Sequence, residues 1–381
     1  MNGNWITAWS MAHCEIALMT PKTAKKTIRT TIIGNVSGSK IRICLSNKMG
    51  SKVISVGSVY VRVGEQKNFQ ILFGGKPEIN LVPGQDMLSD GVTTEVKAGD
   101  EIIVSLYYPW SNNPTSGSFT AKAVHSGKGD FSQNESFPIE TFEPFMARIM
   151  HIPVTEPTTI LAGVDIYTES KVNVVAAFGD SITHMGFWVN PLTSRLYKEY
   201  PERLALLNMG ISGNRLLRDT GVKMFKQFFG LAGTRRMEWD LFKISGLTTV
   251  ILALGINDIP QEPSSGMLAP KARDVCTYEE LIEGYRNVIT ACHSRGIEVF
   301  GCTITPLGGY KTFNQKTEEL RRKTNEWILN SGEFDRTFDF AAWISEVENP
   351  AYLPGEYDIG DHLHINERAG ENIASKINLT I

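Results

Sequence analysis

Two short motifs in the second half of the chain carry side chains suited to nucleophilic catalysis. Residues 179–181 read Gly-Asp-Ser after an apolar run, and residues 361–364 read Asp-His-Leu-His. A serine hydroxyl is a poor nucleophile that needs a base, and an imidazole base needs an acceptor on its other nitrogen to fix its tautomer. We therefore predict Ser181 as the nucleophile, His364 as its base and Asp361 as the carboxylate that orients His364.

Two loops between these motifs supply groups that could bind an oxyanion. Residues 208–214 read Asn-Met-Gly-Ile-Ser-Gly-Asn, and residues 255–258 read Gly-Ile-Asn-Asp. The tetrahedral intermediate of acyl transfer needs hydrogen-bond donors that are already in place. We predict the backbone N–H groups of Ser181 and Gly213 and the side-chain amide of Asn257 for this role. Taken singly, these residues also fit a helix-capping serine, a turn glycine and an Asn-Asp turn.

The motifs are spaced by apolar runs that predict a parallel sheet. Runs at 174–178, 204–209, 248–254 and 297–304, with a weaker fifth at 337–342, alternate with segments of helical spacing. We expect one helix to begin at a capping box formed by Thr277 and Glu280, a second over 318–329, and a third capped by Asn366. Alternating strands and helices predict a doubly wound sheet, whose loops converge at the carboxyl ends of the strands. Residues 216–244 fit poorly, and we expect a long insertion near the site.

The first part of the chain has a different pattern. Short β-branched or alternating runs at 27–34, 40–47, 56–63, 69–73, 101–108 and 118–124 are separated by Gly, Pro, Asn and Asp. We expect a long loop over 126–143 and closing strands at 147–152 and 158–167. This pattern predicts a sandwich or jelly roll without helices. We place an all-β accessory domain at residues 1–168 and a catalytic domain at residues 172–381.

Composition limits the class of protein and its partners. The 381 residues are 42% hydrophobic and 21% charged with a net charge of -3, so we expect neither nucleic acid nor membrane partners. The N-terminal residues lack a basic segment followed by an apolar core, which predicts a cytoplasmic protein. We expect five reduced thiols and no metal or organic cofactor, and the oligomeric state stays open. The cysteines are Cys14, Cys44, Cys276, Cys292 and Cys302.

The four motifs together resemble the SGNH superfamily of GDSL-type esterases and lipases. The resemblance covers 172–381 and rests on Ser181, Gly213, Asn257 and His364, with Asp361 completing an Asp-x-x-His signature. It implies a flavodoxin-like three-layer α/β/α domain with a five-stranded parallel sheet. The sequence departs from the family pattern after the nucleophile, where Ile replaces Leu, and after the base, where Ile replaces Pro.

The leading region resembles the jelly-roll domain that precedes some bacterial SGNH carbohydrate esterases. The motifs are residues 42–47 followed by Gly50, then Pro-Gly at 83–84 and Ser-Asp at 89–90, and residues 213–217 add to the match. The resemblance implies a serine esterase that removes small acyl groups, above all acetyl, from sugar hydroxyls of oligosaccharides through an acyl-enzyme. We expect three residues near the motifs to contact substrate: His184, Trp188 and Asn214.

Three alternatives remain open. A lipase or thioesterase could use the apolar residues after Gly213 for a longer acyl chain, although these also fit core packing: Leu216, Leu217, Phe225, Phe228 and Phe229. A metal-dependent hydrolase could use the cluster Asp358, Asp361, His362 and His364. A non-catalytic carbohydrate-binding protein could use Trp5, Trp9 and Trp110. Neither Gly-x-Ser-x-Gly nor a phosphate-binding Gly-x-x-x-x-Gly-Lys loop is present, which disfavours an ordinary α/β-hydrolase and a nucleotide site.

Overall fold

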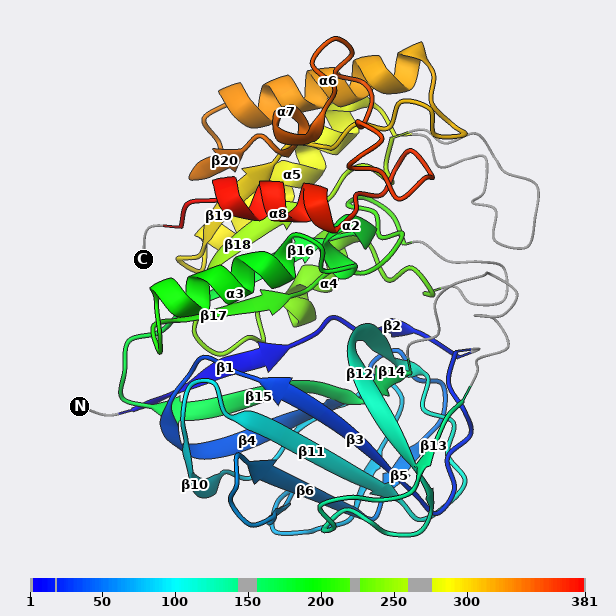
Figure 1. Cartoon of the computed structure of the whole chain (residues 1–381), viewed down its shortest axis with the longest axis vertical. Helices are drawn as coiled ribbons and strands as arrows, with labels where there is room; N and C mark the ends of the chain where they lie inside the picture. Colours follow the sequence, from blue (N-terminus) through cyan, green and yellow to red (C-terminus); the bar gives the residue numbers. More distant parts are fainter. Residues whose placement is uncertain (1–2, 18, 143–155, 220–226, 260–275, 380–381) are drawn as a thin grey trace. The chain divides into compact units, whose positions relative to one another are not determined.

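The computed structural model describes residues 3–17, 19–142, 156–219, 227–259 and 276–379 (Figure 1). The chain forms two compact units. The first comprises Met1–Val172 with Pro201–Ala205, and the second comprises Asn173–Tyr200 with Leu206–Ile381. The break after Val172 lies next to the boundary expected from the sequence, whereas the assignment of Pro201–Ala205 was not anticipated. No helix within the described residues combines the length and the apolar character needed to cross a bilayer.

The first unit is built of antiparallel sheets. One sheet has the order β1 (Asn4–Ser10), β15 (Leu161–Thr168), β4 (Gly38–Ser46) and β10 (Val92–Val96), with β9 (Asp86–Leu88) also paired to β4. The larger sheet has the order β13 (Ile139–Glu140), β12 (Ser116–Lys128), β3 (Lys26–Ile33), β11 (Glu101–Tyr108), β6 (Ser58–Val63) and β7 (Phe69–Ile71); β14 (Pro157–Thr159) and β2 (Cys14–Glu15) pair with β12. A two-stranded sheet joins β5 (Ile54–Val56) and β8 (Ile79–Leu81).

Alternation along these strands builds the core of the first unit. In β4, Ile41, Ile43 and Leu45 are buried, since every second side chain faces the same side of a sheet. Most of the expected strands are confirmed with shifted ends, and β11 has the expected bounds. The runs at 56–63 and 158–167 are each divided between two strands, β5 and β6 in the first case and β14 and β15 in the second. The expected loop over 126–143 is partly wrong, because β12 continues to Lys128 and β13 lies within it. The strand expected at 147–152 lies outside the described residues.

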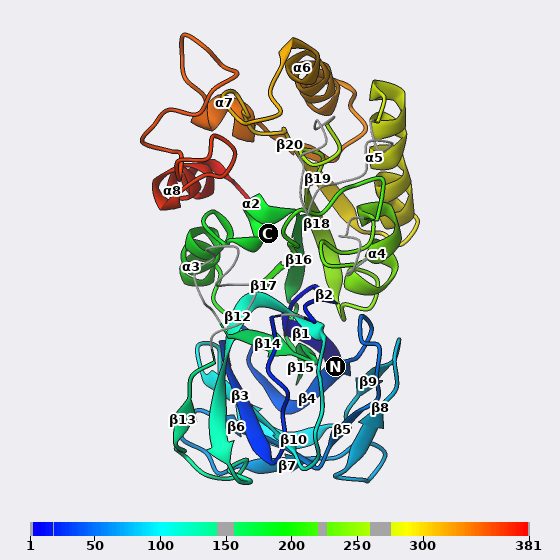
Figure 2. The same ribbon diagram turned by 90° about the vertical axis from the view of Figure 1, so that its right-hand side faces the viewer.

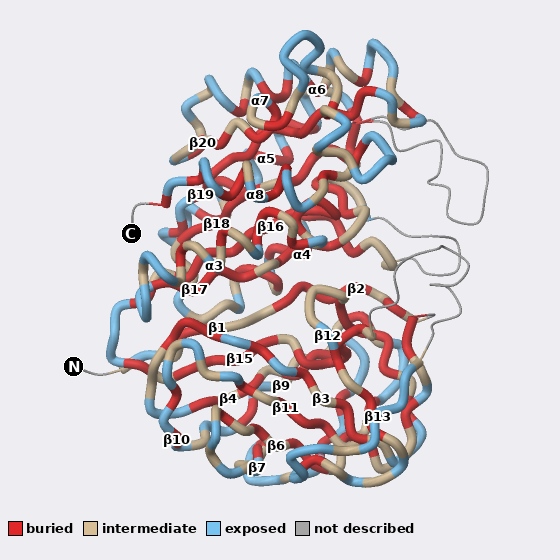
Figure 3. Tube along the Cα trace, viewed as in Figure 1, coloured by how far each residue is buried: buried red, intermediate tan, exposed pale blue. Residues whose placement is uncertain are grey.

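Apart from Leu204 and Ala205 of β17, the second unit contains a five-stranded sheet in the order β17 (Leu204–Asn208), β16 (Asn173–Gly179), β18 (Leu247–Ala253), β19 (Glu298–Cys302) and β20 (Arg336–Phe338). The pairs β16–β18, β18–β19 and β19–β20 are parallel. Numbered along the chain, this is the order 2-1-3-4-5 of flavodoxin-like sheets. Continuous burial of β16 explains why it is apolar throughout rather than alternating (Figure 3).

Helices cover both faces of this sheet, which gives three layers (Figure 2). On one side α3 (Val189–Glu199) and α7 (Phe340–Ile344) pack against α8 (Glu367–Lys376). On the other, α5 (Tyr278–His293) packs against α4 (Gly233–Asp240) and α6 (Gln315–Asn330). The short α2 (Ser181–His184) follows β16 directly. The expected three-layer parallel fold is thus confirmed for this part of the chain.

Two expectations for the second unit need correction. The run at 337–342 is not one strand, since β20 ends at Phe338 and the side chain of Asp339 caps the helix α7 by accepting from Ala342 N. The segment 216–244, expected to be a long insertion, contains α4, one of the helices that cover the sheet. That helix has no side-chain cap at Ala232, so the usual start signal is missing from the sequence.

The cysteines are free thiols. Cys44 is half-buried, and the other four are buried. Their burial agrees with the expectation of mostly buried thiols.

Candidate active site

The nucleophile candidate lies where β16 passes into α2. Asp180 is the N-cap of this helix, and its carboxylate accepts a hydrogen bond from Ile182 N at 3.0 Å. Ser181 is the first helical residue and is 7% exposed. Gly179 is needed here for space, because a Cβ on it would lie 2.0 Å from Thr183 Oγ1. β16 and β18 are the strands between which the chain order reverses, which is where ligands bind in such sheets.

Ser181, His364 and Asp361 form one hydrogen-bonded chain. The Oγ of Ser181 lies 2.8 Å from Nε2 of His364, and Nδ1 of His364 lies 2.6 Å from Oδ2 of Asp361. A carboxylate only accepts, so a neutral imidazole carries its proton on Nδ1 and offers Nε2 as the acceptor for the serine hydroxyl. This is the arrangement that a serine nucleophile requires.

The loop before α8 holds Asp361 in place. One carboxylate oxygen of Asp358 accepts hydrogen bonds from the backbone N–H groups of Gly360, Asp361 and His362. Asp361 in turn accepts from the backbone N–H of His364 through the oxygen that does not face the imidazole. Burial raises the pKa of Asp361, but its hydrogen bonds with the side chain and backbone of His364 outweigh this and lower it to about 2. Asp361 is therefore ionised at neutral pH.

The structure brings the oxyanion-hole candidates to the same strand ends. Gly213 follows β17, has a φ of +70° and lies against the ring of Phe229, where a Cβ would be 2.6 Å from Cδ1. Asn257 follows β18 and donates from Nδ2 to the backbone oxygen of Asn214 at 3.0 Å. Within the described residues, no hydrogen-bond partner is found for the backbone N–H of Ser181 or Gly213. These groups are suited to receive an oxyanion.

Of the three expected substrate contacts, two need correction. Trp188 is fully buried and packs edge-on against Phe340, so it cannot touch a substrate. Asn214 is also fully buried, and its amide nitrogen donates to the backbone oxygens of Phe229 and Leu231. Both side chains are structural. Their burial could not be seen from their nearness in sequence to the motifs.

His184 remains close to the site. It is half-buried, and its Nδ1 lies 2.6 Å from the hydroxyl of Ser212, the residue before Gly213. Burial, and to a lesser extent the nearby charge of Arg236, lowers the pKa of His184 to about 4. The ring is therefore neutral at pH 7 and joins α2 to the loop that carries Gly213.

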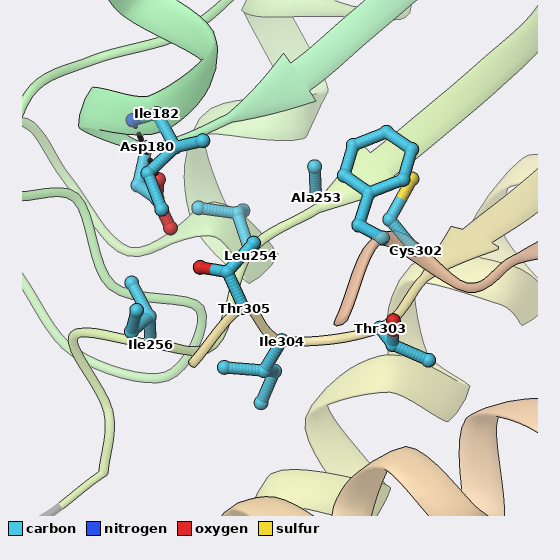
Figure 4. A pocket seen from close by; sticks show the side chains of 10 residues that line it. Asp180, Ile182, Ala253, Leu254, Ile256, Cys302, Thr303, Ile304 and Thr305 are labelled. Atoms are coloured by element: carbon cyan, nitrogen blue, oxygen red, sulfur yellow. Dashed lines mark hydrogen bonds between the residues drawn. The ribbon is translucent and has the colours of Figure 1, made fainter. Parts of the chain in front are cut away.

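A small cavity lies beside the nucleophile (Figure 4). It has a volume of about 20 Å³, which accommodates one water molecule but not an acyl chain. The hydroxyl of Thr305 is buried there without a hydrogen-bond partner in the described residues. Asp180 borders the same cavity, and burial raises the pKa of this carboxyl to about 7. The lining residues are Asp180, Ile182, Ala253, Leu254, Ile256, Cys302, Thr303, Ile304, Thr305 and Phe340.

The acidic and histidine cluster before α8 is divided into two pairs. Asp361 pairs with His364, while His362 Nδ1 lies 2.8 Å from Asp358 Oδ2. Across the described residues, no three His, Cys, Asp or Glu side chains are grouped as a metal site requires. Asp358, the alternative metal ligand of the sequence analysis, acts as the acceptor that shapes the loop.

Comparison with known proteins assigns the chain to a family. The model of the GDSL-like lipase/acylhydrolase family matches residues 177–370, just over half of the chain. The chain belongs to this family. As a GDSL acylhydrolase it is an ester hydrolase, and the matched region contains Ser181 and His364. No protein of curated function matches the sequence.

Several solved structures are similar to this GDSL hydrolase. The acetyl xylan esterase AlAXEase has 20% identity and a TM-score of 0.40, covering 54% of this chain and 97% of its own. A family two carbohydrate esterase from Clostridium thermocellum, solved with cellohexaose, has 13% identity and a TM-score of 0.39, covering 98% of this chain and 92% of its own. A GDSL-like lipase from Bacteroides thetaiotaomicron has 14% identity and a TM-score of 0.39, covering 53% and 84%.

Proposed function

We propose that this GDSL hydrolase is a serine esterase that removes small acyl groups, above all acetyl, from sugar hydroxyls of oligosaccharides. The observation that carries the catalytic part is the continuous hydrogen-bonded chain from Ser181 through His364 to Asp361. The resemblance to carbohydrate esterases motivates the sugar ester. We also propose that residues 1–168 form an accessory domain of jelly-roll type and residues 172–381 the catalytic domain.

The proposed reaction has two steps. Ser181 Oγ attacks the ester carbonyl carbon while its proton passes to Nε2 of His364, and Asp361 stabilises the imidazolium. The oxyanion accepts hydrogen bonds from the N–H groups of Ser181 and Gly213 and from the Asn257 amide. The C–O bond to the sugar breaks, and the leaving oxygen takes the proton from His364. Water then attacks the acyl-enzyme with His364 as base, releasing the carboxylic acid and Ser181.

The packing of the apolar residues after Gly213 favours a short acyl group. Leu216 is fully buried, and a Cβ on Gly284 of α5 would lie 2.4 Å from Leu217 Cδ2. Leu216 is thus poorly placed to line an open acyl channel, while Leu217 is half-buried and packs against α5. Phe229 lies against Gly213 and T-stacks with Phe228, while Phe225 lies outside the described residues. The burial of Leu216 fits the core-packing interpretation better than a lipase or thioesterase channel, whereas Phe228 and Phe229 are half-buried.

The decisive experiment separates catalysis by Ser181 from substrate choice. Ser181→Ala is expected to abolish hydrolysis of p-nitrophenyl acetate while leaving the thermal unfolding transition in place, and retained turnover overturns the assignment of the nucleophile. A p-nitrophenyl series from acetate to octanoate then tests chain length. A maximum at acetate, together with acetate release from acetylated xylo-oligosaccharides, supports the proposal. A maximum at octanoate points to a lipase or thioesterase instead.

A further inference from the structure

Arg236 of α4 is buried beneath the strand ends that carry the candidate site. Its side chain is 0% exposed. Burying a guanidinium is costly unless it is paired and hydrogen-bonded, so its partners indicate what it is for. The carboxylate of Asp240, one turn further along α4, lies 2.9 Å from Nη1 and supplies the opposite charge.

Other contacts of Arg236 reach the carboxyl ends of two different strands. Nη2 donates to the backbone oxygen of Gly179 at 2.9 Å, and Nη1 donates to that of Met209 at 3.0 Å. Nε donates to Oδ1 of Asn214 at 2.8 Å. Gly179 is two residues before Ser181, whereas Met209 and Asn214 flank the loop that contains Gly213. One guanidinium therefore joins the nucleophile segment to the oxyanion-hole segment.

Two further contacts extend this connection. The guanidinium carbon lies 3.8 Å from the ring centroid of Phe178, the residue before Gly179. The guanidinium is therefore held by a cation–π contact on one face as well as by hydrogen bonds at its edges. The Gly179 oxygen also accepts from Ile211 N at 3.1 Å. Through Asn214, whose backbone oxygen accepts from Asn257, the same network reaches the third proposed oxyanion donor.

We propose that Arg236 is a positioning residue for ester hydrolysis, which sets the separation between Ser181 and the donors at Gly213 and Asn257. This rests on the proposed function of those residues. A planar guanidinium directs several N–H groups at fixed angles, whereas a lysine ammonium is a compact point charge on a flexible stem. Misplacement of reacting groups by about 1 Å can cost on the order of 100-fold in rate. Arginine, and not just a positive charge, is therefore required.

The test compares Arg236→Lys with Arg321→Lys. Arg321 is also buried at 3% exposure, pairs with a carboxylate on its own helix, Glu318, and donates to the backbone oxygens of Ile304 and Pro350. We expect Arg236→Lys to lower kcat on p-nitrophenyl acetate by about 10- to 100-fold with KM changed less than threefold. Arg321→Lys should lower the melting temperature comparably but leave kcat within threefold. Equal kcat losses in both variants overturn the proposal.

A second pair of variants, with smaller changes, tests the proposal if Arg236→Lys does not fold. Phe178→Leu removes the ring under Arg236, and Phe300→Leu removes the ring under Arg336, whose guanidinium carbon is 5.1 Å from its centroid. We expect Phe178→Leu to lower kcat by about three- to tenfold at unchanged KM, and Phe300→Leu to leave it unchanged. An unchanged kcat in Phe178→Leu contradicts the proposal.

Hydrogen–deuterium exchange separates failure of this inference from failure of the proposed function. Peptides covering 208–217 should exchange faster in Arg236→Lys or Phe178→Leu than in Arg321→Lys or Phe300→Leu, whether or not the protein hydrolyses the ester. Unchanged exchange in those peptides overturns the positioning role. If these peptides exchange faster in the variants but the wild-type protein shows no Ser181-dependent turnover, the positioning role of Arg236 is supported. In that case only the proposed reaction is refuted.

Discussion

The side-chain amide of Asn257 donates to the backbone oxygen of Asn214, so the loops after β18 and β17 are hydrogen-bonded directly beside Gly213. A primary amide has two N–H groups. One is used in this contact and fixes the orientation of the side chain. Within the described residues the second has no partner in the structure, which suits a donor held ready for an oxyanion.

Replacing Asn257 with alanine tests this donor. We expect kcat to fall by about 10²–10³ with little change in KM, because an oxyanion donor acts on the transition state more than on the bound ester. Steady-state kinetics with p-nitrophenyl acetate measure both constants. Asn330→Ala, at the exposed end of α6, is the control. A loss in Asn257→Ala below threefold removes Asn257 from the oxyanion hole.

Replacing Asp361 with asparagine tests the orientation of His364. The amide no longer demands a proton on Nδ1, so the imidazole can adopt the wrong tautomer, and we expect kcat to fall by roughly 10³–10⁴. His362→Asn is a control in the same loop, since His362 has a φ of +63°, which asparagine tolerates. We expect its kcat to stay within threefold. Loss of activity in this control, restored by a divalent metal, favours the metal-dependent alternative.

The ionisation of Asp361 can be tested by titrating its carboxyl group. The pKa of Asp361 is lowered to about 2, so this carboxylate stays ionised at every pH above about 4 and protonates only as the pH falls through 2. We therefore expect the Asp361 carboxyl, followed by NMR, to show no titration between pH 8 and pH 4. An inflection in that range contradicts the lowered pKa of Asp361.

Replacing Gly213 with alanine combines backbone strain with a clash. Gly296 offers a matched control, because it has the same φ of +70° but nothing within 4 Å of an added Cβ, whereas Gly213 has the ring of Phe229 at 2.6 Å. Gly296→Ala should lower the free energy of unfolding by about 1–2 kcal/mol, because alanine is strained at this positive φ, and should leave kcat unchanged. Gly213→Ala should also lower kcat at least tenfold, since its loop must shift. Equal activity of the two variants excludes a role for the geometry at Gly213.

Replacing Asp180 with asparagine tests the buried carboxyl beside the cavity. Its pKa is raised to about 7 by burial, against the opposing effects of Ile182 N–H and His364. Between pH 3.8 and 7 the unfolded state binds fewer protons than the folded state, so this group's contribution to stability is lost as the pH rises. Asparagine can still accept from Ile182 N without ionising.

We therefore compare the free energy of unfolding of Asp180→Asn with that of wild type at two pH values. The difference should be more favourable to the variant at pH 8 than at pH 5, on the order of 1–3 kcal/mol. Thermal unfolding at both pH values measures the difference. Asp258 is likewise buried with its pKa raised to about 6, so it contributes a pH dependence of the same sign in both proteins. A stability difference that is the same at pH 5 and pH 8 contradicts the raised pKa of Asp180.

Much of the catalytic fold could be read from local patterns. The strands β16 and β18 are continuous apolar runs because both faces of the sheet are covered by helices, and α5 begins at a capping box that is formed in the structure. Where the local signal was weak, the prediction failed: α4 has no side-chain cap, and Phe338 and Phe340 belong to a strand and a helix separated only by Asp339.

By itself, the sequence determined which reactive groups are present and in what order, because the serine and glycine–asparagine motifs follow apolar runs whose carboxyl ends must meet, and the histidine motif stands before the last helix. Only the tertiary structure decided which polar residues near them are available to a substrate. Trp188 and Asn214 are buried, and Arg236, which resembles its exposed neighbour Arg235 in sequence, lies at the centre of the network. Burial and hydrogen bonding depend on neighbours brought together from distant segments, and no local pattern records them.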